Sequence, residues 1–225
     1  MNIKNKNIVV VGASSGLGKA LAERLAREKC NLFLLSRRIK KIKFPFPAIK
    51  ITCDVTSPES IKKAFSLIDQ KTNRVDILVN CAGIGLEKRL ENSTEEEIEK
   101  VIRTNLMGLI LVSREAYKRM LKNKSGHIVN ISSTSGKKAR ERETVYCASK
   151  WGVAGFSESL RLEAKKNKIR VTTVYLGGMK TDFYHHIPTK DLTGFMDPKY
   201  VAQEIVGLIK SDSSICPSEI VIERT

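Results

Sequence analysis

The sequence lacks the features that mark membrane, secreted or metal-binding proteins. It has no apolar run of the roughly 18 residues that a membrane-spanning helix needs. Its five cysteines are odd in number and no two have C-x-x-C spacing, so the sequence predicts neither a disulfide framework nor a metal site. The basic and then apolar start is too short for a signal peptide and runs into a glycine motif. We therefore expect a cytoplasmic protein.

Acidic residues are scarce relative to basic ones. Forty Lys and Arg against 24 Asp and Glu give a formal net charge of +16. Such a charge attracts nucleic acid, anionic membranes or acidic substrates. The basic residues are scattered, however, with few aromatics between them and no recognition motif. We expect a solvated basic surface, with no nucleic-acid partner and no membrane partner.

Linkers, internal repeats and low-complexity segments are also absent, which favours a single domain over residues 1–225. Short apolar runs alternate with helical patterns instead. Strands are predicted at residues 7–11, 31–35, 48–52, 75–79, 126–132, 169–175 and 218–223. Helices are predicted at 16–28, from 56 with a Thr56–Glu59 capping box, and at 93–121, 145–166 and 198–210. This alternation predicts an α/β fold: a Rossmann-type doubly wound parallel sheet of about seven strands with helices on both faces.

A glycine motif follows the first predicted strand and opens the first predicted helix. Its spacing lets backbone N–H groups and the positive end of the helix dipole approach a phosphate, because glycine has no Cβ to block the turn. The alternative is a plain tight turn, but the strand before it and the helix after it favour dinucleotide binding. The predicted cofactor-binding residues here are Gly12, Ser14, Ser15, Gly16, Leu17 and Gly18.

The second predicted strand ends at Arg37 and Arg38, and no Asp or Glu lies there. In a dinucleotide fold this position reads the ribose, with an acid for a free 2′-hydroxyl and an arginine for a 2′-phosphate. A planar guanidinium bonds two phosphate oxygens and stacks on adenine. The sequence therefore predicts NADP(H) rather than NAD(H). The alternative is an ordinary pair of surface arginines.

Two further strand ends complete the predicted cofactor site. Asp54 and Val55 follow the third strand, where they would bond an adenine edge and pack on its face. Asp54 as a plain loop residue is the alternative. Asn80, Ala82 and Gly83 follow the fourth strand, where small residues let the backbone approach the cofactor.

Tyr146 and Lys150 lie at i and i+4 of one predicted helix, so their side chains point the same way. A phenol has a pKa of about 10 and is a poor acid or base at neutral pH. A nearby ammonium favours the phenolate, so we expect Lys150 to lower the pKa of Tyr146 toward useful proton transfer. The alternative is a surface pair. The site gains support from Ser133, which ends the fifth strand.

Taken together, these motifs resemble the short-chain dehydrogenase/reductase family. The resemblance covers nearly the whole chain and includes Asn105, Ser133, Tyr146, Lys150, Gly177 and Thr181. It implies an NADP(H)-dependent oxidoreductase that transfers hydride between nicotinamide and a small-molecule carbonyl or secondary alcohol. Reduction is the direction that NADPH favours. Thr181 would bond the carboxamide of the cofactor, helped by the backbone at Gly177.

The resemblance also implies a role for each catalytic residue. Ser133 would hydrogen-bond the substrate oxygen. Tyr146 would donate its proton to that oxygen in reduction, or remove it in oxidation. Lys150 would hold the nicotinamide ribose and tune Tyr146, and Asn105 would support a water-linked proton relay to Lys150.

Other properties are implied by the family as well. The predicted helices at 93–121 and 145–166 commonly form dimer faces, which implies a homodimer or homotetramer. The segment 183–197 is expected to cap the pocket. His185 and His186 fall there, and we do not predict them as metal ligands because no carboxylate or cysteine cluster accompanies them.

The chain departs from the family pattern in several places. Val11 stands where Thr is usual, and Leu176 where Pro usually precedes the glycine. Residues 38–48 are too few for the helix that relatives carry, so a loop and an open adenine end are expected. Residues 84–89 do not resemble the pattern of acyl-carrier reductases, which makes that substrate the weaker option.

Two alternatives stay open. The pocket loop at 134–144 holds Lys137, Lys138, Arg140 and Arg142, which indicates either an anionic substrate or carrier, or a solvated charged loop. A non-catalytic dinucleotide-binding sensor of the same fold is the alternative function, and the complete set of catalytic residue types argues against it.

Overall fold

The computed structural model describes residues 2–184 and 191–224. Among these residues seven strands form one parallel sheet in the order β3-β2-β1-β4-β5-β6-β7. The strands are β1 (Asn7–Val11), β2 (Asn31–Ser36), β3 (Ile49–Thr52), β4 (Ile77–Asn80), β5 (Gly126–Ile131), β6 (Ile169–Leu176) and β7 (Glu219–Ile222). The chain moves outward from β1 to β3 and then crosses back to β4, so the strand order reverses between β1 and β4. This confirms the predicted doubly wound fold, and ligands bind at such a switch point.

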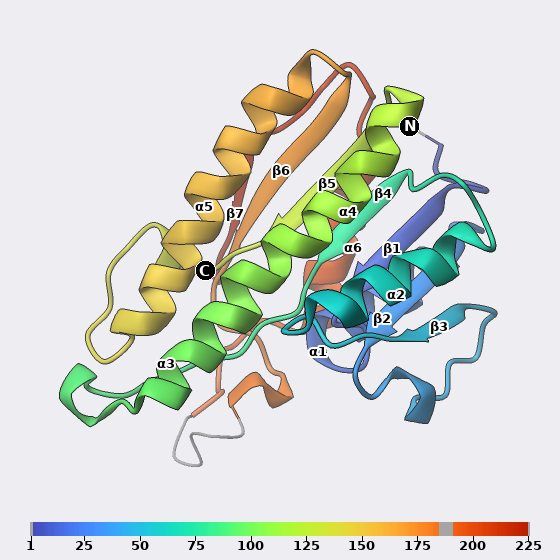
Figure 1. Ribbon diagram of the computed structural model, residues 1–225. Coiled ribbons are helices and arrows are strands. Elements are labelled where there is room, and N and C mark those ends of the chain that lie inside the picture. The colour runs from blue at the N-terminus through green and yellow to red at the C-terminus, as the bar shows by residue number, and fades with distance from the viewer. Residues whose placement is uncertain (1, 185–190, 225) are drawn as a thin grey trace.

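Helices cover both faces of the sheet (Figure 1). They are α1 (Gly16–Ala26), α2 (Pro58–Asp69), α3 (Glu95–Ile102), α4 (Gly108–Asn123), α5 (Thr144–Lys165) and α6 (Pro198–Ile209). Helices α2, α4 and α5 lie in front of the sheet in Figure 1, and α1 and α6 lie behind it. None of the described helices is both long and apolar enough to cross a membrane.

Alternate residues of each central strand enter two different cores, because side chains of a strand point to opposite faces. Ile8 and Val10 of β1 belong to the cluster under α1 and α6. Val9 and Val11 belong to the cluster under α2, α4 and α5. Strands that are buried on both faces are therefore continuously apolar, as the sequence predicted.

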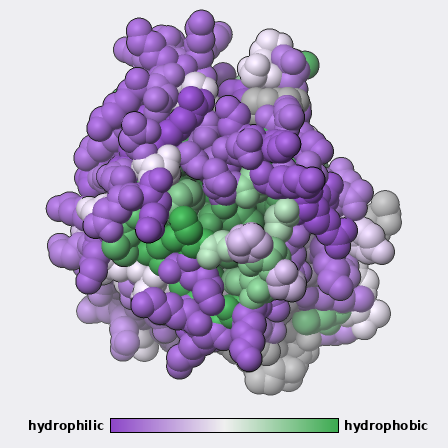
Figure 2. Space-filling view, turned by 90° about the vertical axis from the view of Figure 1, so that its right-hand side faces the viewer, coloured by the Kyte–Doolittle hydropathy of each residue, from purple (hydrophilic) through white to green (hydrophobic). Residues whose placement is uncertain are grey.

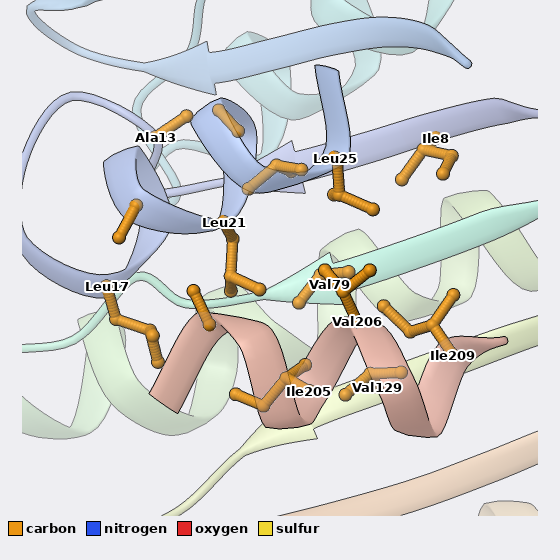
Figure 3. Packing of buried hydrophobic residues seen from close by; sticks show 14 of the residues in the cluster. Ile8, Ala13, Leu17, Leu21, Leu25, Val79, Val129, Ile205, Val206 and Ile209 are labelled. Carbon is orange, nitrogen blue, oxygen red and sulfur yellow. The ribbon is translucent and has the colours of Figure 1, made fainter. Parts of the chain in front are cut away.

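Helices α1 and α6 pack against each other on the rear face (Figure 3). Helix α1 contributes side chains at i, i+4 and i+8, which lie on one helix face. The side chains at this contact are Leu17, Leu21, Leu25, Ile205, Val206 and Ile209. Burial of each such side chain stabilises the fold by about 1.5–3 kcal/mol. This packing fixes where α1 begins, and with it the turn that precedes the helix.

The start of α2 differs from the prediction. Ser57, not Thr56, is the N-cap residue, and its Oγ accepts a hydrogen bond from the backbone N–H of Ser60 at 3.1 Å. Thr56 Oγ1 instead donates to Asp54 Oδ1 at 2.8 Å. The predicted Thr56–Glu59 capping box is therefore wrong, because Pro58 occupies the first helical position and makes its neighbour the cap.

The long helix predicted at 93–121 is interrupted. Helix α3 ends at Ile102, five residues (Arg103–Met107) form a wider π-type turn, and α4 continues from Gly108. Such turns inside helices occur often at functional sites. Asn105 lies in this turn, and its side-chain contacts are described below.

Residues 38–48 contain no α-helix, as expected, and only one short 3-10 helix, η1 (Ile39–Lys41). The rings of Phe44 and Phe46 are tilted by 45° to each other with centroids 5.1 Å apart, and they pack on the rear core. Figure 2 views the molecule from the side on which β3 lies in Figure 1, and it shows an apolar area framed by hydrophilic side chains. Ile49 of the edge strand β3 is 37% exposed.

Candidate active site

A cavity of about 790 Å³ lies at the carboxyl ends of the strands. It brings together all but two of the residues that the sequence predicted as functional. Those that line it are Gly12, Ser14, Ser15, Gly16, Leu17, Gly18, Arg37, Arg38, Asp54, Val55, Ala82, Gly83, Ser133, Tyr146, Lys150, Gly177 and Thr181. Asn80 and Asn105 do not line it.

The strand order divides this cavity into two ends. We call the part at β1, β2 and β3 the glycine end, and the part at β5 and α5 the tyrosine end. The glycine end holds the motif at 12–18, Ser36, Arg37 and Arg38. The tyrosine end holds side chains from several separate segments, which are Ser133, Glu143, Tyr146, Glu87, Phe183, Tyr184 and Phe195.

The glycine end is built for close backbone approach. Gly12 has φ +83°, and a Cβ on it would lie 2.7 Å from the backbone N of Ala82. A Cβ on Gly18 would lie 2.3 Å from the carbonyl O of Gly12, so any side chain there would force the turn and helix apart. Ser15, the N-cap of α1, makes no side-chain cap, and the first turn has no acid. The N–H groups at this helix start therefore remain available to an anion.

The end of β2 adds polar groups to the glycine end. Ser36 Oγ is buried without a hydrogen-bond partner among the described residues. Such an orphaned hydroxyl is costly unless a ligand satisfies it. Arg37 and Arg38 follow it, and both are exposed. No acidic residue occurs between Glu28 and Asp54, so this end of the cavity is basic.

Asp54 lines the cavity and also makes hydrogen bonds within the turn that precedes α2. Its Oδ1 accepts hydrogen bonds from the N–H of Thr56 at 2.9 Å and from Thr56 Oγ1 at 2.8 Å. One carboxylate oxygen thus holds the turn before α2. The residue also lines the cavity, and its contact with an adenine edge stays a prediction.

Tyr146 and Lys150 lie one turn apart near the start of α5. Lys150 Nζ is 5.7 Å from the centroid of the Tyr146 ring and donates to the carbonyl O of Ile131 at 3.2 Å. Ser133 lies close enough to the Tyr146 hydroxyl to lower its pKa. Ser133 Oγ also accepts from the N–H of Ser135 at 3.1 Å. The three predicted catalytic side chains are therefore neighbours.

The acid–base balance of this pair differs from the prediction. Burial raises the pKa of Tyr146, the nearby Ser133 hydroxyl acts in the opposite direction, and the charge of Glu143 raises it further. Burial also lowers the pKa of Lys150 to about 8. Desolvation is the largest effect on the pKa of Tyr146 and raises it, so the lowered pKa that the sequence predicted for this phenol is not found in this structure. Tyr146 is protonated at neutral pH.

Asn105 lies buried behind the cavity wall rather than in it. Its Oδ1 accepts from the N–H of Ile84 at 2.8 Å, and its Nδ2 donates to the carbonyl O of Ile84 at 2.9 Å and to Ser149 Oγ at 3.1 Å. The amide thus pairs with the backbone after β4 as a strand would. A Cβ on Gly83 would meet Asn105 Oδ1 at 3.4 Å and Lys150 Nζ at 3.6 Å. Asn105 therefore fixes the wall that faces Lys150, and the proton relay stays a prediction.

Asn80 lies in the core instead of the cavity. Its Nδ2 donates to Ser113 Oγ and to Asn130 Oδ1, both at 2.9 Å, and its Oδ1 is buried without a partner among the described residues. As the last residue of β4, it is directed by the strand alternation toward α4. Its side chain therefore belongs to the core, and the expected approach of the backbone at this strand end to a cofactor stays a prediction.

Aromatic rings extend from Tyr146 along one wall. The ring centroids of Tyr146 and Phe183 are 6.0 Å apart, those of Phe183 and Tyr184 5.2 Å, and those of Tyr184 and Phe195 5.4 Å, all with edge-to-face geometry. The guanidinium of Arg224 lies 5.5 Å from the Phe195 centroid. Phe183, Tyr184 and Phe195 belong to the segment 183–197 that was expected to cap the pocket, whereas no spacing in the sequence related Arg224 to this wall. Glu143, three positions before Tyr146, was part of the expected pocket loop but was not predicted as a site residue.

Only one of the four basic residues in the pocket loop lines the cavity. Arg140 does so, and its Nη2 donates to Thr134 Oγ1 at 2.9 Å. Lys137 pairs with Glu219 and lies 4.3 Å from the Tyr175 ring centroid, away from the cavity. Lys138 and Arg142 do not line the cavity either. The structure favours a solvated charged loop over an anion site.

Comparison with known proteins decides the family. Residues 6–191 match the family model of the short chain dehydrogenases. The chain belongs to this family. It is 34% identical over 223 residues to a 3-oxoacyl-[acyl-carrier-protein] reductase of Bos taurus, and 33% identical over 217 residues to carbonyl reductase family member 4 of Xenopus laevis. Each alignment covers 92% of this chain and 92% of the relative.

Solved structures of the family share the architecture. An alcohol dehydrogenase from the archaeon Thermococcus sibiricus, complexed with 5-hydroxy-NADP, has a TM-score of 0.88 at 25% identity, over 96% of this chain and 95% of its own. A metagenomic short-chain oxidoreductase in complex with NADP has a TM-score of 0.87 at 26% identity, over 100% of this chain and 99% of its own. The family resemblance predicted from the sequence is confirmed, and with it a Rossmann-fold oxidoreductase.

Two thiols, those of Cys53 and Cys81, line the cavity. Burial raises the pKa of Cys81, which lines the cavity, to about 12, so its thiol stays protonated. Within residues 2–184 and 191–224, no group of three or more His, Cys, Asp or Glu side chains is arranged to hold a metal. His185 and His186 lie outside the described residues.

Proposed function

We propose that the protein is an NADP(H)-dependent oxidoreductase that interconverts a carbonyl compound and its secondary alcohol, with reduction as the favoured direction. One observation carries this proposal: a single cavity joins a glycine turn suited to a phosphate to the half-buried Ser133 and Tyr146 and the buried Lys150. Tyr146 acts as the proton donor. A non-catalytic sensor would not need a protonated phenol at the far end of its dinucleotide site.

The residues present fit NADP(H). Three features of the glycine end suit its phosphates: the uncapped start of α1, the orphaned hydroxyl of Ser36, and the basic pair Arg37 and Arg38. The two solved structures described above were determined with NADP or its 5-hydroxy form, which supports the same preference. Backbone of the motif at 12–18 would hold the pyrophosphate, Arg37 and Arg38 the 2′-phosphate, and Asp54 and Val55 the adenine. When bound, the cofactor supplies the hydride.

The nicotinamide half would rest between the two ends. A Cβ on Gly16 would lie 3.4 Å from Thr181 Cβ, so Thr181 sits directly over the glycine turn. We assign it and the backbone at Gly177 to the carboxamide, and Lys150 to the nicotinamide ribose. Ala82 and Gly83 leave room for the cofactor against the sheet edge.

The chain's own groups supply orientation and a proton. Ser133 Oγ and the Tyr146 hydroxyl are neighbours that line the same end of the cavity, so one carbonyl oxygen can accept from both. Tyr146 gives up its phenolic proton as the alcohol forms. The Lys150 ammonium, one helical turn away, stabilises the phenolate that results. Lys150 thus acts on Tyr146 in the transition state rather than in the resting protein.

Assembly and location are part of the proposal. Met107, Trp151 and Leu162 are 50%, 52% and 61% exposed, and they lie between α3 and α4 or on α5. Large apolar side chains on these helices support a homodimer or homotetramer. We also propose one domain over 1–225, a pocket cap at 183–197 of which 185–190 lie outside the described residues, and a cytoplasmic location.

The test is cofactor consumption by the purified protein. NADPH and NADH are compared with a panel of ketones that includes 3-oxoacyl thioesters, because relatives are named as 3-oxoacyl-[acyl-carrier-protein] reductases. We expect turnover with NADPH, a clear preference over NADH, and a loss of about 10³-fold in Tyr146→Phe. A Tyr146→Phe variant as active as the parent, or no NADPH binding, would refute the proposal.

A further inference from the structure

Ser133 and Tyr146 are placed by two different elements, and a loop joins them. Ser133 lies just after β5 and directly precedes the short 3-10 turn η4 (Thr134–Gly136), whereas Tyr146 lies in the first turn of α5. The proposed chemistry needs both hydroxyls at one carbonyl oxygen. Because a displacement of about 1 Å can slow a reaction about 10²-fold, the relative position of these two elements has to be fixed.

A chain of hydrogen bonds runs from Ser133 to α5. The N–H of Ser135 donates to Ser133 Oγ at 3.1 Å, and the hydroxyl of the same residue donates to Glu143 Oε2 at 2.8 Å. The carbonyl O of Glu143 in turn accepts from the N–H of Cys147 at 2.7 Å, in the first turn of α5. Ser135 and Glu143 therefore connect the segment that carries Ser133 to the helix that carries Tyr146.

Helix capping does not explain the carboxylate of Glu143. This residue is the N-cap of α5, a position that Ser, Thr, Asp and Asn favour because their short side chains accept hydrogen bonds from the first helical N–H groups. Within the described part of the chain, the Glu143 side chain makes no such bond. Its carboxylate is directed to Ser135 of η4 instead. The bond between the two segments, rather than the stability of the helix, accounts for a carboxylate at this position.

The Ser135 end of this bond is buried and tightly packed. Ser135 is only 3% exposed. A Cβ on the neighbouring Gly136 would lie 2.8 Å from the carbonyl O of Lys150 and 2.8 Å from Ser132 Oγ, so η4 is in close contact with α5. Removal of the acceptor would leave a buried hydroxyl without a partner, which costs more than the bond itself contributes. Because the N–H of Ser135 holds Ser133, the disturbance would reach the hydroxyl that binds the substrate oxygen.

We propose that Glu143 is a positioning residue: through Ser135 it holds Ser133 at the distance from Tyr146 at which both hydroxyls reach one substrate oxygen. This inference deepens the proposed function and rests on it for the roles of the two hydroxyls. Glu143 takes no part in the proton transfer itself. Its contribution to the rate is its acceptor oxygen rather than its charge.

Two substitutions at Glu143 separate the hydrogen bond from the charge. Glu143→Ala removes the acceptor, whereas Glu143→Gln keeps an amide oxygen to which Ser135 can donate. With the best ketone of the panel, we expect kcat to fall about fivefold in Glu143→Ala and to stay within about twofold of the parent in Glu143→Gln. The KM for NADPH should be unchanged in both variants, because the glycine end is untouched. An equal loss of kcat in the two variants, or an unchanged kcat in Glu143→Ala, overturns the inference.

Glu141→Ala is the matched control. Glu141 lies on the same loop, pairs with Arg89 at 3.6 Å, has a side chain that is 82% exposed, and does not line the cavity. Its substitution should leave kcat and KM unchanged. A loss of kcat in Glu141→Ala equal to that in Glu143→Ala would show that any substitution in this loop disturbs the site, and it would refute a specific role for Glu143.

Combination with Ser135→Ala tests whether both residues act through the same bond. Two residues that act through one bond give a double variant no slower than the slower single variant. We expect a loss of kcat of about fivefold in Ser135→Ala, in Glu143→Ala and in the double variant. Losses that multiply to about 25-fold would mean that the two residues act independently, which contradicts the inference.

Hydrogen exchange without cofactor gives a measurement that does not depend on turnover. The amide of residue 135, which is bonded to Ser133 Oγ, should exchange at least about tenfold faster in Glu143→Ala and at the parent's rate in Glu143→Gln. Amides of β5 are the internal reference for the global fold. If these also exchange faster in Glu143→Ala, Ser135→Ala replaces that variant in the same comparison. Unchanged exchange at residue 135 overturns the inference.

The exchange and kinetic results together separate this inference from the proposed function. Ketone reduction by the parent, with no change of exchange at residue 135 in Glu143→Ala, refutes the inference and leaves the proposed function standing. The expected exchange pattern, in a protein whose parent form reduces no ketone, refutes the proposed function instead.

Discussion

The two ends of the cavity are made in different ways. The glycine end is centred on one short segment, the motif at 12–18, which uses mainly backbone groups, because glycines let N–H groups and the start of α1 face the ligand. The tyrosine end comes from β5, α5, the segment after β4 and residues near the C-terminus, and it uses side chains. The comparison shows that anchoring a phosphate needs little more than chain geometry, whereas moving a proton needs side chains from distant segments.

The two ends also differ in solvent and charge. Arg37 and Arg38 are exposed, and water screens them. Lys150 is only 5% exposed, and burial decides its pKa and that of Tyr146. Substitutions at the tyrosine end should therefore change chemistry and stability together, while those at the glycine end should change cofactor affinity.

The largest effect is expected from Lys150→Met. Turnover should fall about 10²–10³-fold, because the phenolate formed on Tyr146 loses its ammonium. The free energy of unfolding of this variant should instead be higher than that of the parent. Burial lowers the pKa of Lys150 from 10.5 to about 8, so between these pH values the unfolded chain binds more protons than the folded one. Below pH 8 the buried charge therefore lowers the free energy of unfolding by its full amount. This loss of stability disappears as pH rises toward 10.5.

Denaturant unfolding without cofactor measures this effect. Lys150→Met should raise the free energy of unfolding at pH 7 by up to about 3 kcal/mol, less the lost hydrogen bond to Ile131 O. The gain over the parent should shrink steadily above pH 8. Exposed Lys138→Met is the control and should show no such pH dependence. A stability difference that stays constant from pH 7 to pH 10 would contradict the assignment.

The next effect tests the glycine end alone. In a variant with both Arg37→Ala and Arg38→Ala, the KM for NADPH should rise about 10–100-fold, because each lost guanidinium–phosphate bond is worth about tenfold. The KM for NADH should change little, and kcat at saturating NADPH should be retained. If kcat falls instead, the glycine end contributes to the chemical step as well as to cofactor affinity.

A smaller effect is expected from the link between Ser133 and Glu143. Ser135 donates its N–H to Ser133 Oγ and its own Oγ to Glu143. Ser135→Ala removes only the second bond, so Ser133 keeps its contact while the carboxylate loses its anchor. We expect kcat to fall about fivefold, which corresponds to one ordinary hydrogen bond. Ser135→Thr, which retains the hydroxyl, should restore most of the rate.

The smallest effect is expected from the outer part of the pocket loop. Lys137→Gln together with Lys138→Gln should leave kcat and KM within about twofold, because neither side chain lines the cavity. The assay uses the best ketone of the panel and a carboxylate analogue. A marked loss confined to the carboxylate would show that the loop attracts anions after all.

The sequence by itself determined the architecture and most of the binding site. Continuous apolar strands between helical patterns required a doubly wound parallel sheet, and the glycine motif and strand-end residues marked the cavity, because these signals are local in the chain. Local signals also located Tyr146, Lys150 and Ser133. They did not show that α3 and α4 are separated at Asn105, or that Asn80 turns into the core, because both depend on partners in other segments.

Only the tertiary structure decided the electrostatics of the tyrosine end. Sequence spacing placed an ammonium beside a phenol and predicted a lowered pKa for Tyr146. Burial reversed that direction, and burial is a property of everything packed around the pair. In the same way, Glu87, Glu143, Phe195 and Arg224 become one surface because the strand ends meet at one edge of the sheet. Desolvation and charge act through space rather than along the chain, so their balance is set when the chain folds.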